Sequence, residues 1–463
     1  MNNLSFLTHL KTNGPLGSKD QFHVFLIFFI AIYVVELFVF WPGVIRPDSL
    51  TQLQQAQTGV FSDHHPPIMA LYWGFLNSIY PGPGLMFLTH MSLLFGATLL
   101  FASFFKDSRW CWFYLFIPIW PQISFYSSFV LKDVGFTFSF LFVCSILTFY
   151  SLHQKKLPIR LALPICGLLF YGTAVKFQAA FVLPCLSLWL AYSLNAYRFS
   201  FTVLFQSLLF FCLLLGSVQF FNHHMTHKKD HSWQFVKLYD LAGISLKKNE
   251  DLFPDFVKNK PFFSMTALAR KFNSQRVDEL VFDAEPLLIK GKTEQQRNSL
   301  WYTWLEAIQN YPGSYFLHRW ELFQHLLRKS PIKSMSEIAS HQEFIPSLIR
   351  DILLRCEAHG LTVFFKTITS FGFYLPFMML YLVLGLVCIK RDPYAIPLVF
   401  LNSTGLTLLL VLFVFSMASD VRYIYLTMCC FHFSHPFFFK TFKNFIEKDQ
   451  IYWIFKKRKI TTA

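Results

Sequence analysis

The feature that most constrains this chain is a series of long apolar runs. Residues 22–41 and 201–221 are two such runs, each about 20 residues long and almost free of charge. A run of that length matches the thickness of a bilayer, whereas a soluble core rarely needs it. Charged residues make up 14% of the 463 residues, against about 25% in soluble globular proteins. The sequence therefore predicts an all-α integral membrane protein.

The basic residues of the chain gather in loops between these runs and in the C-terminal tail. The net charge is +15, and basic residues gather in loops 154–160 and 390–391 and in the tail at 456–459. Lys and Arg in short loops hold those loops on the cytoplasmic side of a membrane. We therefore interpret the excess charge as a topology signal and expect no nucleic acid as a partner.

If the basic loops are placed on the cytoplasmic side, the chain crosses the membrane with about ten helices. The predicted spans are 22–42, 84–105, 110–127, 129–150, 161–175, 178–194, 201–221, 363–389, 394–417 and 424–440. This divides the chain into an N-terminal transmembrane module (1–221) with a catalytic first outer loop (43–83), an extracytoplasmic domain (222–362), and C-terminal transmembrane helices with a basic cytoplasmic tail (363–463). We expect a multi-pass protein of the bacterial inner membrane, in contact with membrane lipids.

The two predicted outer segments both contain helix signals. In the first outer loop, Pro47-Asp48-Ser49 and Pro66-Pro67 each open a short stretch of helical spacing, which predicts two interfacial helices. In the extracytoplasmic domain, 294–311 and 314–329 show amphipathic spacing, so a mainly helical domain is expected.

Titratable residues concentrate at the predicted outer ends of the helices. Charged groups beside membrane helices are costly unless they have a function, and random placement would scatter them over both faces. The sequence therefore predicts a site at the outer interface. Its candidate members come from four separate loops: Arg46, Asp48, Asp63, His65, Lys132, Asp133, Lys176 and Arg422.

Each candidate also has a plainer interpretation. Asp48 is either a general base or a helix N-cap. The segment Asp63-His64-His65-Pro66-Pro67 orients a substrate, caps a helix, or binds a metal, and we expect no metal because adjacent residues seldom turn to one ion. Lys132-Asp133, like Lys176 and Arg422, binds an anionic lipid headgroup or only snorkels. Histidines 223, 224, 227 and 231 are interpreted as a flexible juxtamembrane loop.

The first outer loop resembles that of GT-C-fold glycosyltransferases. The resemblance rests on Arg46-Pro47-Asp48, a short helix, and then Asp63-His64-His65-Pro66-Pro67, which is similar to the Asp-x-His-Pro-Pro element of protein O-mannosyltransferases. It covers about residues 44–75. The chain has Ser49 where many members of that family have Glu, and Ala70 where they have Lys.

This resemblance implies a function for the candidate residues. The donor would be a polyprenyl-phosphate-linked sugar, and Asp48 would deprotonate an acceptor hydroxyl on an extracytoplasmic glycan, lipid or protein, with inversion at the sugar. Lys132, Lys176 and Arg422 would stabilise the departing lipid phosphate, and His65 would orient acceptor or phosphate. No cofactor beyond this donor substrate is expected.

Two other functions stay open at this stage. A transporter or flippase for lipid-linked sugars would need charged or broken helices near mid-membrane, whereas the ionisable residues of this chain gather at helix ends. A scaffold for envelope assembly would use the outer domain to bind partners. Walker, dinucleotide-binding and GxSxG motifs do not occur in the sequence, so nucleotide and serine-hydrolase chemistry have no support.

Overall fold

The computed structural model describes residues 18–328 and 370–461, and its regular structure there is helical. Residues 1–17 of the predicted cytoplasmic segment, residues 329–362 of the predicted extracytoplasmic domain and the start of the span predicted at 363–389 lie outside these ranges.

Six described helices are long and apolar enough to cross a membrane, as expected of a helical membrane protein. Two further apolar helices, α9 (Ile159–Val175) and α10 (Ala179–Leu194), are shorter. The six long helices are α2 (Ser18–Phe40), α5 (Gly84–Ser103), α8 (Lys132–Leu152), α11 (Phe201–Met225), α21 (Phe371–Cys388) and α22 (Ala395–Phe415).

Two of the predicted spans are wrong in detail. Residues 110–127 do not form one helix but two short ones, α6 (Trp110–Phe116) and α7 (Pro121–Ser127), with a turn between them. Pro118 and Pro121 explain the break, because proline cannot donate the backbone hydrogen bond that a continuous helix requires. The last helix, α23 (Tyr425–Thr461), does not end near residue 440 but continues into the basic tail.

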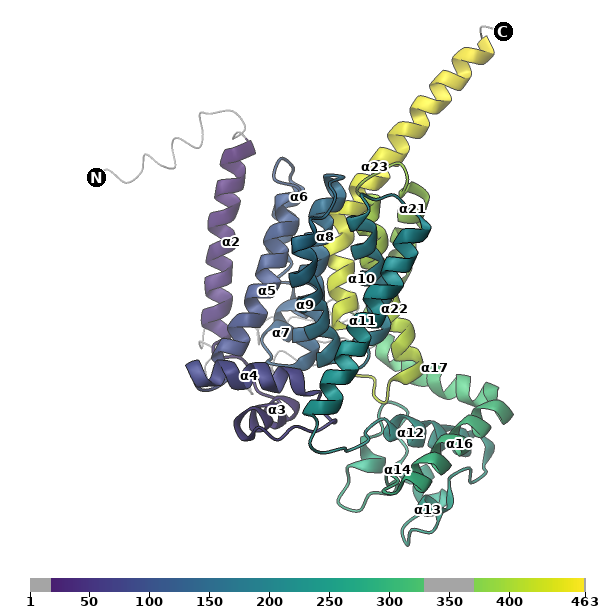
Figure 1. The fold of residues 1–463 in the computed structure, drawn as a ribbon. Coiled ribbons are helices and arrows are strands. Elements are labelled where there is room, and N and C mark those ends of the chain that lie inside the picture. Colours follow the sequence, from purple (N-terminus) through teal and green to yellow (C-terminus); the bar gives the residue numbers. More distant parts are fainter. Residues whose placement is uncertain (1–17, 329–369, 462–463) are drawn as a thin grey trace, which may run out of the picture.

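The long helices run side by side, and the start of α2 and the end of α23 lie at the same end of the bundle (Figure 1). At the opposite end, α3 (Pro47–Thr58) and α4 (Pro67–Ile79) lie across the bundle rather than along it. Proline in the first turn starts each of these helices, and Gly59 ends α3 with a left-handed φ of 69°. The two short helices predicted in the loop are therefore confirmed.

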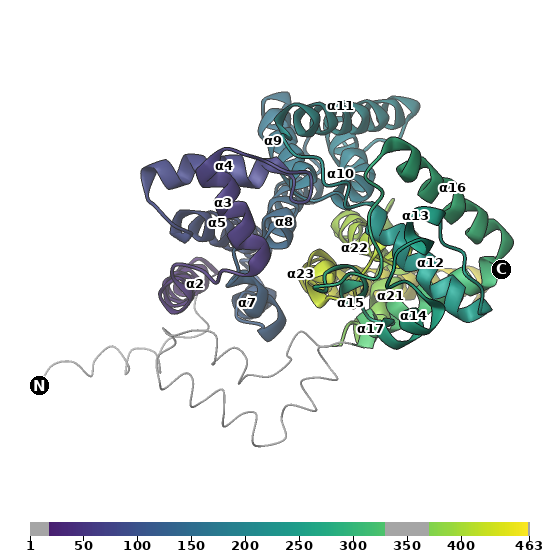
Figure 2. The ribbon, with the colours of Figure 1, turned by 90° about the horizontal axis from the view of Figure 1, so that it is seen from below.

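A small helical lobe projects from the α3 end of the bundle (Figure 1); viewed along the bundle axis, it lies on the side of α21 and α22, away from α3 and α4 (Figure 2). It has its own apolar core, which includes Leu238, Leu268, Leu280 and Leu300. The predicted helices 294–311 and 314–329 are confirmed as α16 and α17. The helices of the lobe are α12 (Gln234–Lys248), α13 (Asp255–Lys258), α14 (Met265–Lys271), α15 (Asp278–Val281), α16 (Glu294–Asn310) and α17 (Pro312–Arg328).

A buried arginine of the lobe links it to the bundle. Arg319 of α17 donates to the Asp240 carboxylate of α12 at 2.6 Å, and neither side chain is exposed. The same guanidinium donates to the backbone carbonyl of Ser416, just after α22. Because one buried cation serves both partners, the position of the lobe is tied to the end of α22.

A backbone bridge fixes the start of α3 against the start of α8. The N–H of Val44 donates to the carbonyl of Ser128 at 2.8 Å, and the N–H of Val130 donates to the carbonyl of Val44 at 3.1 Å. Asp48 follows Val44 by four residues and Lys132 follows Val130 by two. The bridge therefore brings two predicted site residues to the same end of the bundle.

Candidate functional site

Asp48 and Arg422 meet at the α3 end of the bundle, although 374 residues separate them in sequence. Asp48 lies in the first turn of α3, and Arg422 lies in the short helix η1 (Val421–Ile424) between α22 and α23. Nη1 of Arg422 donates to Oδ2 of Asp48 at 2.7 Å, and its Nε lies 3.0 Å from Oδ2 of Asp420. About a quarter of each side chain in the Asp48–Arg422 pair is exposed, so the pair is accessible from outside.

Lys132 joins the same group through His65. Its Nζ lies 2.9 Å from Nδ1 of His65, which is 3% exposed and lies in the loop between α3 and α4. Lys132 also lies close enough to Asp48 for its charge to act on that carboxylate. Its hydrogen bond goes to an imidazole, and the carboxylates of Asp48 and Asp133 are the anions that act on its charge.

Asp133 and Lys176 are a buried ion pair within this group. They make a direct ion pair between the start of α8 and the end of α9, and both are almost fully buried. The ring of Tyr423 lies 5.0 Å from Nζ of Lys176 and 5.4 Å from the guanidinium carbon of Arg422. Tyr423 thus contacts two cations at once, as expected of an aromatic face.

The surroundings decide the protonation states of the two residues best placed for proton transfer. Burial alone would raise the pKa of the Asp48 carboxyl, but Arg422 and Lys132 outweigh burial and hold that pKa below its usual value. Burial, together with the neighbouring Lys132 and His64, lowers the pKa of His65 to about 3. At neutral pH the site therefore presents an ionised carboxylate and a neutral imidazole.

The six residues Asp48, His65, Lys132, Asp133, Lys176 and Arg422 are called here the charged cluster. It combines a carboxylate that can accept a proton with two cations, Arg422 and Lys132, that can bind a phosphate, while Lys176 is paired with Asp133. A group-transfer reaction with an acidic leaving group needs both functions. The sequence predicted all six members, and the structure brings them together.

Arg46 and Asp63 were predicted for the same site but make other contacts. The Arg46 guanidinium lies over the ring of Phe129, 5.3 Å from its centroid. The Asp63 carboxylate accepts the backbone N–H groups of Asp230 and His231, so it holds the segment after α11. We assign both residues positioning roles.

Two of the four histidines, His223 and His224, lie in the last turn of α11 and not in a loop, contrary to the prediction, and the other two follow that helix. Nδ1 of His227 accepts the backbone N–H of Phe61 at 3.2 Å, and the N–H groups of His227 and Lys228 both donate to the carbonyl of Phe61. Pairing with the 61–63 segment therefore orders this stretch. Among the described residues, no three His, Cys, Asp or Glu side chains are grouped as a metal site requires.

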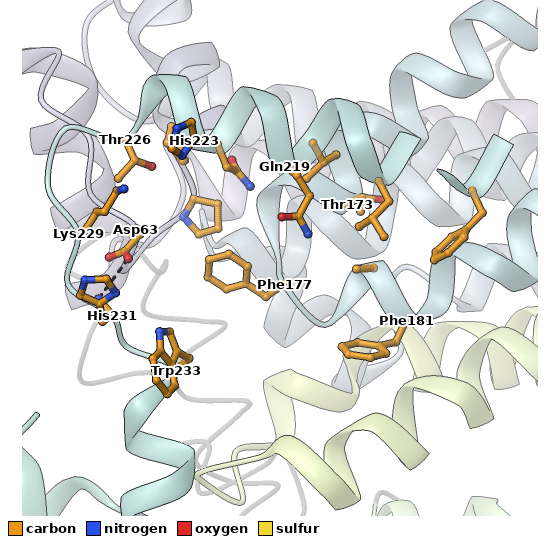
Figure 3. Close-up of a pocket in the computed structure, with 17 residues that line it drawn as sticks. Asp63, Thr173, Phe177, Phe181, Gln219, His223, Thr226, Lys229, His231 and Trp233 are labelled. Atoms are coloured by element: carbon orange, nitrogen blue, oxygen red, sulfur yellow. Dashed lines mark hydrogen bonds between the residues drawn. The ribbon is translucent and has the colours of Figure 1, made fainter. Parts of the chain in front are cut away.

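Two cavities of similar size lie in the helical bundle. The first, the α11 cavity, has a volume of about 550 Å³ and lies between α10, α11 and the 63–67 loop (Figure 3). Its wall includes Pro66 and Pro67, which directly follow His65 of the charged cluster. The 63–67 loop thus contributes to both sites.

The second, the aromatic cavity, has a volume of about 570 Å³ and lies between α6, α21 and α23. Phenylalanine, tyrosine and tryptophan form most of its wall. His432 in this wall bonds to Gln122 of α7 at 3.2 Å, and Tyr126 of α7 packs against Tyr425 at the start of α23. Helix α7 therefore connects the aromatic cavity to the segment that carries Arg422.

The sequence analysis missed Tyr423 and Glu36. Tyr423 could have been found as an aromatic residue beside a predicted cationic one. Glu36 is the one acidic residue in the first apolar run, a signal in itself, because a carboxylate within a membrane span usually has a partner. Its partner is the hydroxyl of Ser124 on α7, 3.1 Å away. The contact fixes α7 against α2.

No family model, curated protein or solved structure matches this chain. The function has to be inferred from the site itself.

Proposed function

We propose that the chain is a membrane glycosyltransferase that moves a sugar from a polyprenyl-phosphate donor to an extracytoplasmic acceptor. The observation that carries the proposal is the meeting of Asp48 with Arg422, Lys132 and the Asp133–Lys176 pair at one end of the bundle. A general base and fixed cations are the two requirements of such a transfer.

In the proposed step, an acceptor hydroxyl attacks the anomeric carbon of the donor sugar. Its proton passes to Asp48, a new carbon–oxygen bond forms, and the bond from the anomeric carbon to the phosphate oxygen breaks. The lipid phosphate leaves with the bonding electron pair and is stabilised by Arg422 and Lys132. Attack opposite to the leaving group inverts the configuration of the sugar.

The resting contacts of the cluster suit this order of events. Arg422 is shared between Asp48 and Asp420. A phosphate that recruits Arg422 weakens its hold on Asp48 and so makes that carboxylate a stronger base. His65, neutral at physiological pH, can accept from Lys132 and keep its ammonium directed at the phosphate.

The aromatic cavity supplies a place for the donor's tail. It is almost entirely apolar in lining, and α7 connects it to the Arg422 segment. An unsaturated prenyl chain is an apolar ligand that such a wall of rings can bury.

The proposal is tested in a strain that lacks the gene, complemented with the wild type or with Asp48→Asn. The matched control is Asp255→Asn, which changes an exposed acid in the first turn of another helix. Glycan and lipid mass spectrometry should show one glycosylated species that wild type and Asp255→Asn restore. Asp48→Asn should fail to restore it, because loss of a general base costs about 10²–10⁴ in rate.

Full restoration by Asp48→Asn would remove Asp48 from the mechanism. Unchanged glycans in the deletion strain, together with the loss of a protein complex, would instead favour the scaffold function.

A further inference from the structure

The α11 cavity has a polar end and an apolar end (Figure 3). Its polar end carries His223, Lys229 and His231, together with Thr226. Its apolar end is formed by aromatic and aliphatic side chains of α10 and α11: Phe177, Ala180, Phe181, Phe211, Leu215 and Val218. A ligand that fills both ends has a polar head and an apolar body.

The apolar end faces the side of α11 that meets lipid. Only 17% of the apolar window of this helix is buried in the protein. Leu208 and Leu209, on the same helix, are 60% and 44% exposed. Exposed leucines on a helix of span length face lipid tails, so the apolar end of the cavity is reached from the bilayer.

Two polar atoms in the wall lack a partner among the described residues. They are Oδ1 of Asn222 and Oγ1 of Thr173, and Thr173 is 3% exposed. Buried polar groups in proteins are normally hydrogen-bonded. The Asp63 carboxylate, the one acid in the wall, accepts two backbone N–H groups, and Lys229 is the one lysine of that wall.

We propose that the α11 cavity binds a phosphate-bearing membrane lipid, and that this lipid is the acceptor of the transfer proposed above. The phosphate lies between Lys229, His223 and His231, and a tail lies along Phe211 and Leu215. The acceptor role rests on the proposed function, whereas the binding site does not.

The shared 63–67 loop supports the acceptor role. Pro66 and Pro67 line the cavity, and His65 beside them bonds to Lys132 in the charged cluster. A head group at the polar end is thus separated from the cluster by one loop. With the donor tail in the aromatic cavity, donor and acceptor approach Asp48 from different sides of the bundle.

Binding is tested with purified protein in phosphatidylcholine nanodiscs and two photoactivatable probes. One is a phosphatidic acid with a diazirine in its acyl chain, and the other is the corresponding diacylglycerol, which lacks the phosphate. Phosphatidic acid should label α11 near Phe211 and Leu215. Leu215→Trp fills the cavity and should reduce that labelling about tenfold, whereas Leu208→Trp on the lipid face should not.

The charge at the polar end is tested with Lys229→Gln. It should remove most of the preference for phosphatidic acid over diacylglycerol, about tenfold for a charge-assisted hydrogen bond, while the neighbouring Lys228→Gln keeps it. Equal labelling by both probes in the wild type, or labelling that Leu215→Trp leaves intact, overturns the binding site.

The acceptor role is tested in the complemented deletion strain. The species missing from the deletion strain should be a lipid, restored by Leu208→Trp and not by Leu215→Trp. A missing species found on protein, or full restoration by Leu215→Trp, overturns the acceptor role. If Asp48→Asn restores the species while the labelling results hold, the proposed mechanism fails and the lipid site stands.

Discussion

The ion pair between Asp48 and Arg422 can be tested without knowing any substrate. The two side chains approach to 2.7 Å and are 28% and 22% exposed. A double-mutant cycle compares Asp48→Asn, Arg422→Gln and the double variant, and isolates the energy of the pair from the other effects of each substitution.

The structure sets the size of the expected coupling. Two unit charges about 4 Å apart interact by about 4 kcal/mol at an effective dielectric constant of about 20. Water reaches about a quarter of each side chain, and fully exposed pairs are worth only about 0.2–1 kcal/mol. We therefore expect a coupling of about 1–2 kcal/mol for Asp48 and Arg422.

The assay is unfolding of the purified protein by SDS in mixed micelles, followed by tryptophan fluorescence. The control cycle uses Lys247 and Glu321, an ion pair of 2.6 Å on the lobe whose members are 25% and 43% exposed. Its coupling should be below about 1 kcal/mol. If the Asp48–Arg422 coupling is indistinguishable from zero, these residues do not meet in the folded protein, and the reasoning about the charged cluster is refuted.

Two further predictions use the same unfolding assay. Because the pKa of Asp48 is lowered in the folded protein, the Asp48–Arg422 coupling should be complete above the ordinary carboxyl value of about 4 and should disappear as the pH falls below it; a coupling that grows in acid would contradict this sign. Arg319→Met should destabilise the protein by about 3–5 kcal/mol, because it leaves the buried Asp240 carboxylate unpaired, and adding Asp240→Leu should recover most of that loss. No recovery in the double variant would mean that Arg319 acts through Ser416 alone.

The sequence predicts the helices of this fold better than it predicts which of them contact one another. Apolar runs of span length are visible directly, and so are Pro47 and Pro67 as helix starts. The break between α6 and α7 was also visible, in Pro118 and Pro121, but the apolar character of residues 110–127 was given more weight. The apolar composition of this run therefore predicted one helix, whereas its prolines determine that there are two.

The candidate site was predictable as a list of residues and not as an arrangement. Charged groups at helix ends indicated Asp48, Lys132 and Arg422, since each position is costly in a membrane protein. Which of them pair depends on packing between segments hundreds of residues apart, and a single sequence holds no record of that packing. The same limit applies to Asp63, whose carboxylate the structure assigns to backbone groups after α11.

The distance in sequence between Asp48 and Arg422 has a consequence for how the protein is made. Asp48 leaves the ribosome early, and its partner emerges only after α22 has been synthesised. Until then Asp48 has no guanidinium beside it and the cluster lacks one of its cations. Under the proposed mechanism, a nascent chain interrupted before η1 lacks Arg422 and would be inactive, even though many of its helices have already been inserted.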